Sequence, residues 1–428
     1  MLIEYNFSNF KSFKESNTFS MVGVPSFKEL ETDNILELGD SKILKTATIY
    51  GNNASGKSNF VDSLRIMKTV VTTSFRDALV KEQHINIENF LLNTKTEKSA
   101  SSFEVTFICD KIKYRYGFEI DNGKITKEWL FHTTTKETAL FKRENNIFTI
   151  NKTSFKEGIN LESKTRDNVL FLSLVAQFNG NISNNIINWF NNVNFISGLY
   201  DIGYADYTVQ KLKNDNNFSK WLSAILKTLE ISNISIEERD IVENDINKLI
   251  NNTNDEKLAV FLKNAKKMKI STWHKKYDEN NLLVDTIPFD FNKQESEGTK
   301  KFVYLLGSWY DTLKNGKILI VDELDSRLHH HLTKKLIEFF HKHNNNFSQL
   351  IFSSHNILLL DKDLFRRDQI WFTEKNQFGA SELYSLADFK AEKVRNTSAY
   401  YKNYINGKYG ATSFFDIDKF ITDLLQNA

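Results

Sequence analysis

Residues 51–58, Gly-Asn-Asn-Ala-Ser-Gly-Lys-Ser, match the phosphate-binding loop pattern G-x-x-x-x-G-K-[ST] at every fixed position. Glycines at this spacing let the backbone curl so that consecutive N–H groups point at phosphate oxygens, and a following helix adds its positive N-terminus. Lys57 is expected to neutralise the β- and γ-phosphates of ATP, and Ser58 to ligate the Mg²⁺ that bridges them. The alternative is a glycine-rich turn that caps an ordinary helix. The residues predicted to contact the nucleotide are Asn52, Asn53, Ala54, Ser55, Gly56, Lys57, Ser58 and Asn59.

Two adjacent acids could complete such a site. Residues 318–323, Ile-Leu-Ile-Val-Asp-Glu, combine an apolar run typical of a buried strand with two carboxylates at its end. Asp322 is expected to hold Mg²⁺ through water, and Glu323 to accept a proton from the attacking water as a general base. The same pair could mark a solvated strand exit, but the loop at 51–58 favours the catalytic interpretation.

A histidine follows the next apolar segment. His355 lies in Phe-Ser-Ser-His-Asn, directly after the strand predicted at 350–352. At the end of a strand beside the phosphate loop, it is positioned to sense the γ-phosphate. The alternative is a histidine with a structural role only.

The flanking sequence predicts the elements that would position these residues. Strands are predicted at 2–7 and 47–50, and the second leads into the loop and then into a helix through 67. Alternating apolar and polar residues at 103–131 predict an antiparallel meander, whereas helical spacing dominates 161–269. The order strand–helix–strand–helix–strand returns over 282–352. We therefore predict an α/β fold with a parallel or mixed sheet and an antiparallel layer, built from 1–135 and 282–428, with a mainly helical insertion at 136–281.

Composition limits the classes of partner. The 428 residues carry 56 Lys+Arg against 54 Asp+Glu, so there is no net field to attract nucleic acid or a membrane surface. The lysine-rich segments 263–269 and 390–402 are interpreted as solvated helix faces. One cysteine, Cys109, excludes an intrachain disulfide, and no apolar run approaches the length of a membrane-spanning helix. A soluble, cytoplasmic protein without a membrane partner is expected.

In this order, the motifs resemble the ATPase head of the ABC superfamily, in its SMC, RecF and OLD branch. The segment Asn9-Phe-Lys-Ser-Phe13 is similar to the N-terminal motif of SMC-type heads. Within the branch, the chain resembles the AbiLi/RloA-like ATPases of bacterial phage-defence and abortive-infection loci, a group that includes the AriA component of PARIS systems. The resemblance is carried by 294–299, 321–329, 352–356, 366–372 and 404–411.

The resemblance implies further site residues. Ser296 and Gly298 would correspond to the signature motif, which binds the γ-phosphate of a nucleotide held by a partner subunit, so that ATP joins two heads in a homodimer or a higher homo-oligomer. A serine before a helix N-terminus is also a plausible anion site, although Ser296 or Thr299 could simply cap that helix. His355 would be the switch histidine, and 324–329 the loop that crosses the dimer interface.

The chain departs from the family pattern in several places. Glu297 replaces the first of two signature glycines, and Thr412 stands where a proline is expected. For the glutamine loop that follows the first helix, the candidates are Gln83 and the segment 88–92. The residues between the two halves lack sustained heptads, which excludes the long coiled-coil arm of SMC proteins.

These observations predict an ATP-hydrolysing switch that controls a separate effector, a TOPRIM or other nuclease, in bacterial anti-phage defence. One alternative is a DNA-repair-type ATPase that binds DNA directly. Another is an OLD-like nuclease system, although only about 70 residues follow His355. A last alternative is a protein that uses nucleotide only as a structural ligand.

Overall fold

Alternating burial along the N-terminal strands builds an antiparallel sheet in the order β10-β9-β8-β7-β6-β1-β2. Tyr5 and Phe7 of β1 face the core, and Glu4, Asn6 and Ser8, which alternate with them, are half-buried, as expected for a sheet with one solvated face. The meander predicted at 103–131 is present and continues through two more strands. The strands are β1 (Leu2–Ser8), β2 (Asn17–Ser20), β6 (Ser101–Cys109), β7 (Ile112–Asp121), β8 (Lys124–Thr133), β9 (Glu137–Glu144) and β10 (Ile147–Ile150).

A second, mixed sheet has the order β11-β15-β16-β5-β17-β18. Neighbouring strands from β11 to β17 are parallel, and β18 is antiparallel to β17. Strands β5 and β16 are buried along their whole length, which fits the apolar residues Ile49–Tyr50 and Leu350–Phe352 within them. The strands are β5 (Thr46–Tyr50), β11 (Val193–Ser197), β15 (Ile318–Asp322), β16 (Gln349–Ser353), β17 (Ile370–Lys375) and β18 (Ser381–Ser385).

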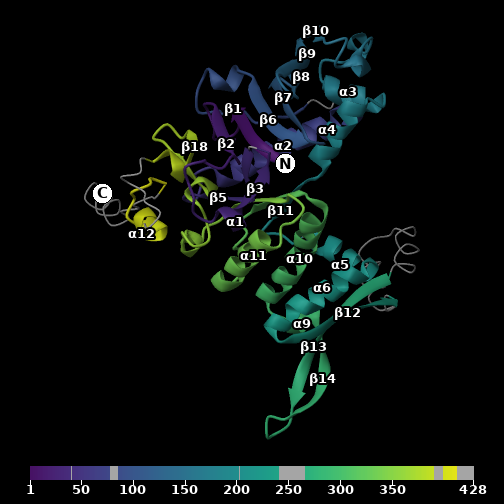
Figure 1. Cartoon of the computed structure of the whole chain (residues 1–428), viewed down its shortest axis with the longest axis vertical. Coiled ribbons are helices and arrows are strands. Elements are labelled where there is room, and N and C mark those ends of the chain that lie inside the picture. The colour runs from purple at the N-terminus through teal and green to yellow at the C-terminus, as the bar shows by residue number, and fades with distance from the viewer. Residues whose placement is uncertain (40, 78–84, 202, 241–265, 390–398, 412–428) are drawn as a thin grey trace, which may run out of the picture. The chain divides into compact units, whose positions relative to one another are not determined.

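Helix α2 (Lys57–Asp77) joins the two sheets through one continuous core (Figure 1). Phe60 is fully buried, with its ring centroid 5.0 Å from that of Phe19 and 6.0 Å from that of Phe7. Burial of such a ring contributes about 1.5–3 kcal/mol. The first turn of α2 is therefore fixed by packing and can serve as a rigid support.

Shorter elements complete this part of the chain. Helices α3 and α4 pack against each other and against α2, and α11 follows β15. The elements are α1 (Glu31–Asn34), β3 (Ile35–Leu38), β4 (Ser41–Leu44), α3 (Phe171–Gln177), α4 (Asn181–Asn191), α11 (His330–Lys342) and α12 (Tyr400–Ile405).

A separate group of elements surrounds the sheet β12-β13-β14. Helix α6 packs on β12, and β13 and β14 form a long hairpin (Figure 1). The elements are α5 (Tyr204–Asn214), α6 (Asn216–Leu226), β12 (Ile231–Asp240), β13 (Lys266–Tyr277), β14 (Leu283–Asp290), α9 (Phe291–Gln294) and α10 (Glu297–Asn315).

The computed structural model describes residues 1–39, 41–77, 85–201, 203–240, 266–389 and 399–411. The chain divides into unit 1 (1–199, 312–326 and 330–428) and unit 2 (200–311 and 327–329). Within the described ranges, no helix is both long enough and apolar enough to cross a membrane.

This division differs from the sequence-based boundaries. The sequence predicts an insertion at 136–281, but β9 and β10 extend the antiparallel sheet and β11 pairs with β15, so 136–199 belong to unit 1. Residues 282–311, predicted as part of the head, belong to unit 2. The insertion also contains a sheet. Residues 266–269, interpreted as a helix face, begin β13, while 258–265, 390–398, Gln83 and Thr412 lie outside the described residues.

Candidate nucleotide-binding site

The loop 51–58 connects the end of β5 to the start of α2. At two positions, Gly51 and Gly56, only glycine fits the backbone. Gly56 has φ 118°, and a Cβ there would lie 2.6 Å from Ser381 Oγ. A Cβ at Gly51 would lie 2.4 Å from the Thr373 carbonyl oxygen. Both glycines thus allow the loop to pack directly on β17 and β18.

Polar contacts hold the loop from the same side. Ser55 Oγ lies 2.7 Å from Thr373 Oγ1, and Ser381 Oγ donates to the Ser55 carbonyl at 2.6 Å. Asn59 in the first turn of α2 donates to Ser12 Oγ at 2.7 Å, and Ser12 Oγ lies 2.8 Å from Ser381 Oγ. Nothing in the sequence assigned Thr373 or Ser381 to this site, because a single hydroxyl on a strand carries no distinctive pattern.

Lys57 lies inside the loop. Its ammonium donates to the carbonyl oxygens of Gly51 at 2.7 Å and Asn52 at 3.0 Å, and the residue is only 5% exposed. Burial lowers the pKa of Lys57 to about 8, although the nearby carboxylates of Asp322, Glu323 and Asp325 favour its charged form. A cation with so little compensation would gain from an anion in the loop, so the residues present fit a phosphate group.

The other loop residues predicted to contact nucleotide are more accessible. Asn53, Ala54 and Ser58 are exposed, and Asn52 and Asn59 are half-buried. The exposed Ser58 hydroxyl at the second residue of α2 and the Asp322 carboxylate would supply oxygen donors only, which is the kind of ligand that Mg²⁺ takes.

The two acids lie at the end of β15. Asp322 is the last residue of the strand, and Glu323 leaves it with φ 58°. Because β15, β16 and β5 are parallel neighbours, their carboxyl ends, which carry the acids, His355 and the loop, share one edge of the sheet. In parallel α/β sheets this edge is where ligands bind.

His355 is brought to Glu323. Its Nε2 lies 3.6 Å from Glu323 Oε1, and its backbone N–H donates to Asp325 at 3.3 Å. The imidazole is 39% exposed, so it can reach a ligand in front of the sheet edge. Lys57, Asp322, Glu323 and His355 all lie within unit 1.

The signature candidates lie in unit 2. Ser296 precedes α10, and its hydroxyl accepts the Thr299 N–H at 3.1 Å, so it acts as the cap of that helix. Arg327, in the loop after Glu323, lies 2.6 Å from Asp201 and 3.6 Å from Glu297. Its carbonyl oxygen would be 3.1 Å from a Cβ at Gly298, so the backbone there is closely packed.

The N-terminal motif fixes the segment that follows α2. Asn9 donates to the carbonyl oxygens of Thr96 and Ser99, both at 2.8 Å, and accepts the Phe90 N–H at 3.0 Å. The Lys11 N–H donates to the Glu88 carbonyl at 2.7 Å. The glutamine-loop candidate 88–92 is thus held by residues 9–11.

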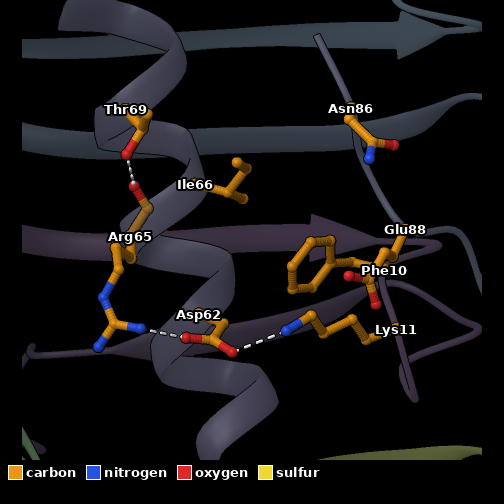
Figure 2. A pocket seen from close by; sticks show the side chains of 8 residues that line it. All are labelled: Phe10, Lys11, Asp62, Arg65, Ile66, Thr69, Asn86 and Glu88. Carbon is orange, nitrogen blue, oxygen red and sulfur yellow. Dashed lines mark hydrogen bonds and ion pairs between the residues drawn. The ribbon is translucent and has the colours of Figure 1, made fainter. Parts of the chain in front are cut away.

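Figure 2 shows the cleft that this arrangement leaves beside α2. The Asp62 carboxylate forms an ion pair with Lys11, whose Nζ lies 2.7 Å from Oδ2, and a second ion pair with Arg65 of the same helix. Glu88 also lines the cleft. Two cations and two carboxylates balance one another, so this cleft has no evident preference for an anion, in contrast to the loop.

The mixed sheet, with the phosphate-loop motif after β5 and the acid pair at the end of β15, and the antiparallel sheet that packs on α2 form an α/β fold. The family described as "AAA domain, putative AbiEii toxin, Type IV TA system" matches residues 47–361, and the chain belongs to this family. The match spans the loop, both acids and His355.

Solved structures similar to this chain include an SMC head domain from Thermotoga maritima, with 14% identity and a TM-score of 0.40 over 90% of this chain and 98% of that one. Another is an SMC head bound to the C-winged helix domain of ScpA, with 14% identity and a TM-score of 0.45 over 92% and 99%. No curated protein matches this chain in sequence.

Proposed function

We propose that the protein binds and hydrolyses ATP to ADP and phosphate. The observation that carries this proposal is the common sheet edge at which Lys57, Asp322, Glu323 and His355 meet. The loop N–H groups and Lys57 would bind the β- and γ-phosphates. Ser58 and Asp322 would hold Mg²⁺, which supplies charge neutralisation of the same phosphates.

Glu323 would act on the attacking water. Its carboxylate is half-buried and lies beside His355. It would accept the proton from a water in front of the γ-phosphate, and His355 would contact that phosphate. A neutral glutamine cannot take the proton but keeps the shape of the side chain, which makes Glu323→Gln the most direct variant.

The test is steady-state ATP hydrolysis by the wild type and two variants. Glu323→Gln is expected to lower kcat by about 10²–10⁴-fold while ATP still binds, because only proton transfer is lost. Lys57→Ala is expected to abolish binding of a fluorescent ATP analogue. The matched control is Glu338→Gln on α11, whose carboxylate pairs with Lys335. Equal kcat for wild type and Glu323→Gln would remove Glu323 from the mechanism.

We also propose that ATP joins two heads, with Ser296 and Gly298 of one copy completing the site of the other. The resemblance of 294–299 to the signature motif supports this, together with the position of Ser296 before the N-terminus of α10, which attracts an anion. The Ser296 hydroxyl accepts the Thr299 N–H and keeps its own proton to donate to a phosphate oxygen. The paired state would regulate or scaffold a separate effector, a TOPRIM or other nuclease, in cytoplasmic anti-phage defence of the AbiLi/RloA and PARIS AriA type.

The effector part of the proposal rests on family resemblance and has its own test. The Glu323→Gln variant with Mg-ATP should retain a nuclease encoded beside it when the two are co-expressed, whereas Lys57→Ala should not. Retention that is the same with both variants would uncouple the effector from ATP.

A further inference from the structure

The backbone at Glu323 adopts a conformation that needs support. A φ of 58° is left-handed, and residues other than glycine rarely adopt it. Such strain persists where the surrounding structure holds it, and it is concentrated at functional sites. Two residues without an assigned role, Ser353 and Gly198, pack against this segment from the two neighbouring strands.

Ser353 is the last residue of β16 and is completely buried. Its hydroxyl donates to Asp322 Oδ1 at 2.5 Å and accepts the Glu323 N–H at 2.8 Å. Its carbonyl oxygen accepts the Leu324 N–H at 3.1 Å. One side chain therefore orients the Asp322 carboxylate and fixes the peptide group that precedes the Glu323 side chain.

Gly198 approaches from the other side, at the end of β11. Its N–H donates to the Asp322 carbonyl at 2.6 Å. A Cβ at this position would lie 1.8 Å from the Glu323 carbonyl oxygen, which is far inside contact distance. Any side chain at 198 would push the Glu323 backbone away, so the close approach requires glycine.

We propose that Ser353 and Gly198 are positioning residues that clamp the Asp322–Glu323 segment from both sides, a role that rests on the proposed ATP hydrolysis. Ser353 sets the direction of the Asp322 carboxylate toward the metal and, with Gly198, holds the Glu323 main chain in its left-handed conformation. Neither residue offers a side chain to a nucleotide, because Ser353 is completely buried and residue 198 is a glycine. Outer-shell partners of metal ligands act in this way, and their loss typically lowers activity or metal affinity by about 10–100-fold.

The test compares Ser353→Ala with Ser348→Ala. Ser348 immediately precedes β16 at its opposite end, is equally buried, and donates to the Thr312 carbonyl at 2.7 Å, so its loss controls for stability alone. Ser353→Thr keeps the hydroxyl and serves as the rescue variant. The readouts are kcat, the KM for ATP, and the Kd of Mn²⁺ in the presence of ADP, measured by electron paramagnetic resonance.

Ser353→Ala is expected to lower kcat and to raise the Mn²⁺ Kd, each by about 10–100-fold, with a KM within about twofold of wild type. Ser353→Thr should recover most of both, and Ser348→Ala should change neither. If Ser353→Ala leaves both kcat and the Mn²⁺ Kd unchanged, the positioning role is overturned.

The metal titration separates this inference from the proposed function. A wild type that does not hydrolyse ATP would refute the proposed function, but the Mn²⁺ Kd of Ser353→Ala would still decide whether Ser353 orients Asp322. Gly198→Ala tests the other side of the clamp without removing a side-chain hydrogen bond. It should lower kcat at least tenfold while ATP binding persists, and a kcat equal to wild type would overturn the role of Gly198.

Discussion

At the scale of single residues, the site depends on close approaches between main chain and side chains. Lys57 is held by carbonyl oxygens of its own loop, and Asp322 by the hydroxyl of Ser353. The glycines of the loop let β17 and β18 pack against it without an intervening side chain. Small additions at these points should therefore have large effects on nucleotide binding.

Gly56→Ala provides a test with a matched control. The added methyl group would lie 2.6 Å from Ser381 Oγ, at a backbone φ of 118°. We expect the affinity for ATP to fall at least about tenfold, which corresponds to about 1.4 kcal/mol. Gly39 also has a positive φ, but a Cβ there would meet nothing within 4 Å. Isothermal titration should show ATP affinity close to wild type for Gly39→Ala. Equal affinities for all three proteins would contradict the role of Gly56.

At the scale of elements, parallel strands bring distant segments to one sheet edge. The strand β16 lies between β5 and β15, so the loop, the acid pair and His355 meet although they are far apart in sequence. At the opposite, N-terminal end of β5, helix α11 is hydrogen-bonded to the strand. His341 Nε2 lies 2.8 Å from Thr46 Oγ1, and Lys45 donates to the His341 carbonyl at 2.8 Å.

This contact predicts a pH dependence of stability. Burial lowers the pKa of His341 to about 3, and the Lys45 ammonium adds to the effect. In the unfolded chain the imidazole titrates near pH 6.5, so below that pH the unfolded state binds a proton that the folded state does not. The stability that the neutral imidazole provides is full above about pH 6.5 and is lost as the pH falls toward 3, by about 1.4 kcal/mol per unit.

The measurement is the free energy of unfolding in urea at pH 7 and pH 5. His341→Gln stays neutral in both states, so the wild type should lose about 2 kcal/mol more than this variant between the two pH values. Equal losses would mean that His341 is not held neutral in the folded protein.

The sequence predicted the elements whose pattern is continuous and locally bounded. The strands β5, β15 and β16 are short buried runs; a glycine follows β5, an acid ends β15 and a serine ends β16. The segments that follow β5 and β15 have apolar residues at helical spacing. Strand β11 was missed because Val193–Ser197 follows α4 directly and includes a polar Asn194. Strand β13 was missed because lysines flank its buried residues Ile270, Ser271 and Thr272, so that no alternation of apolar and polar residues marks it.

The candidate site followed the same rule. Residues within recognisable patterns, such as Lys57 and Glu323, could be chosen from the sequence, because glycine and acid spacing is distinctive. For Ser353, the sequence offers one signal only, namely that it lies in a pair of serines two residues before His355. Thr373 reaches the site because β17 pairs with β5, and Gly198 because β11 pairs with β15. No local sequence pattern predicts either of these long-range pairings.

At the scale of the whole molecule, the residues of the proposed mechanism are divided between two units. Lys57, Asp322, Glu323 and His355 belong to unit 1, and Ser296 and Gly298 belong to unit 2. An ATP-bridged pair of copies would use both units in each site. This makes the assembly state, more than turnover alone, the property that distinguishes a switch from an isolated P-loop ATPase.

The measurement that tests this claim most directly is the solution mass of the Glu323→Gln variant by light scattering, with and without Mg-ATP. Loss of the general base should trap ATP, so the mass should increase when Mg-ATP is added, and a further Ser296→Arg change should abolish the increase. A mass that does not change although ATP binds would contradict the account, because the nucleotide would then not join two heads.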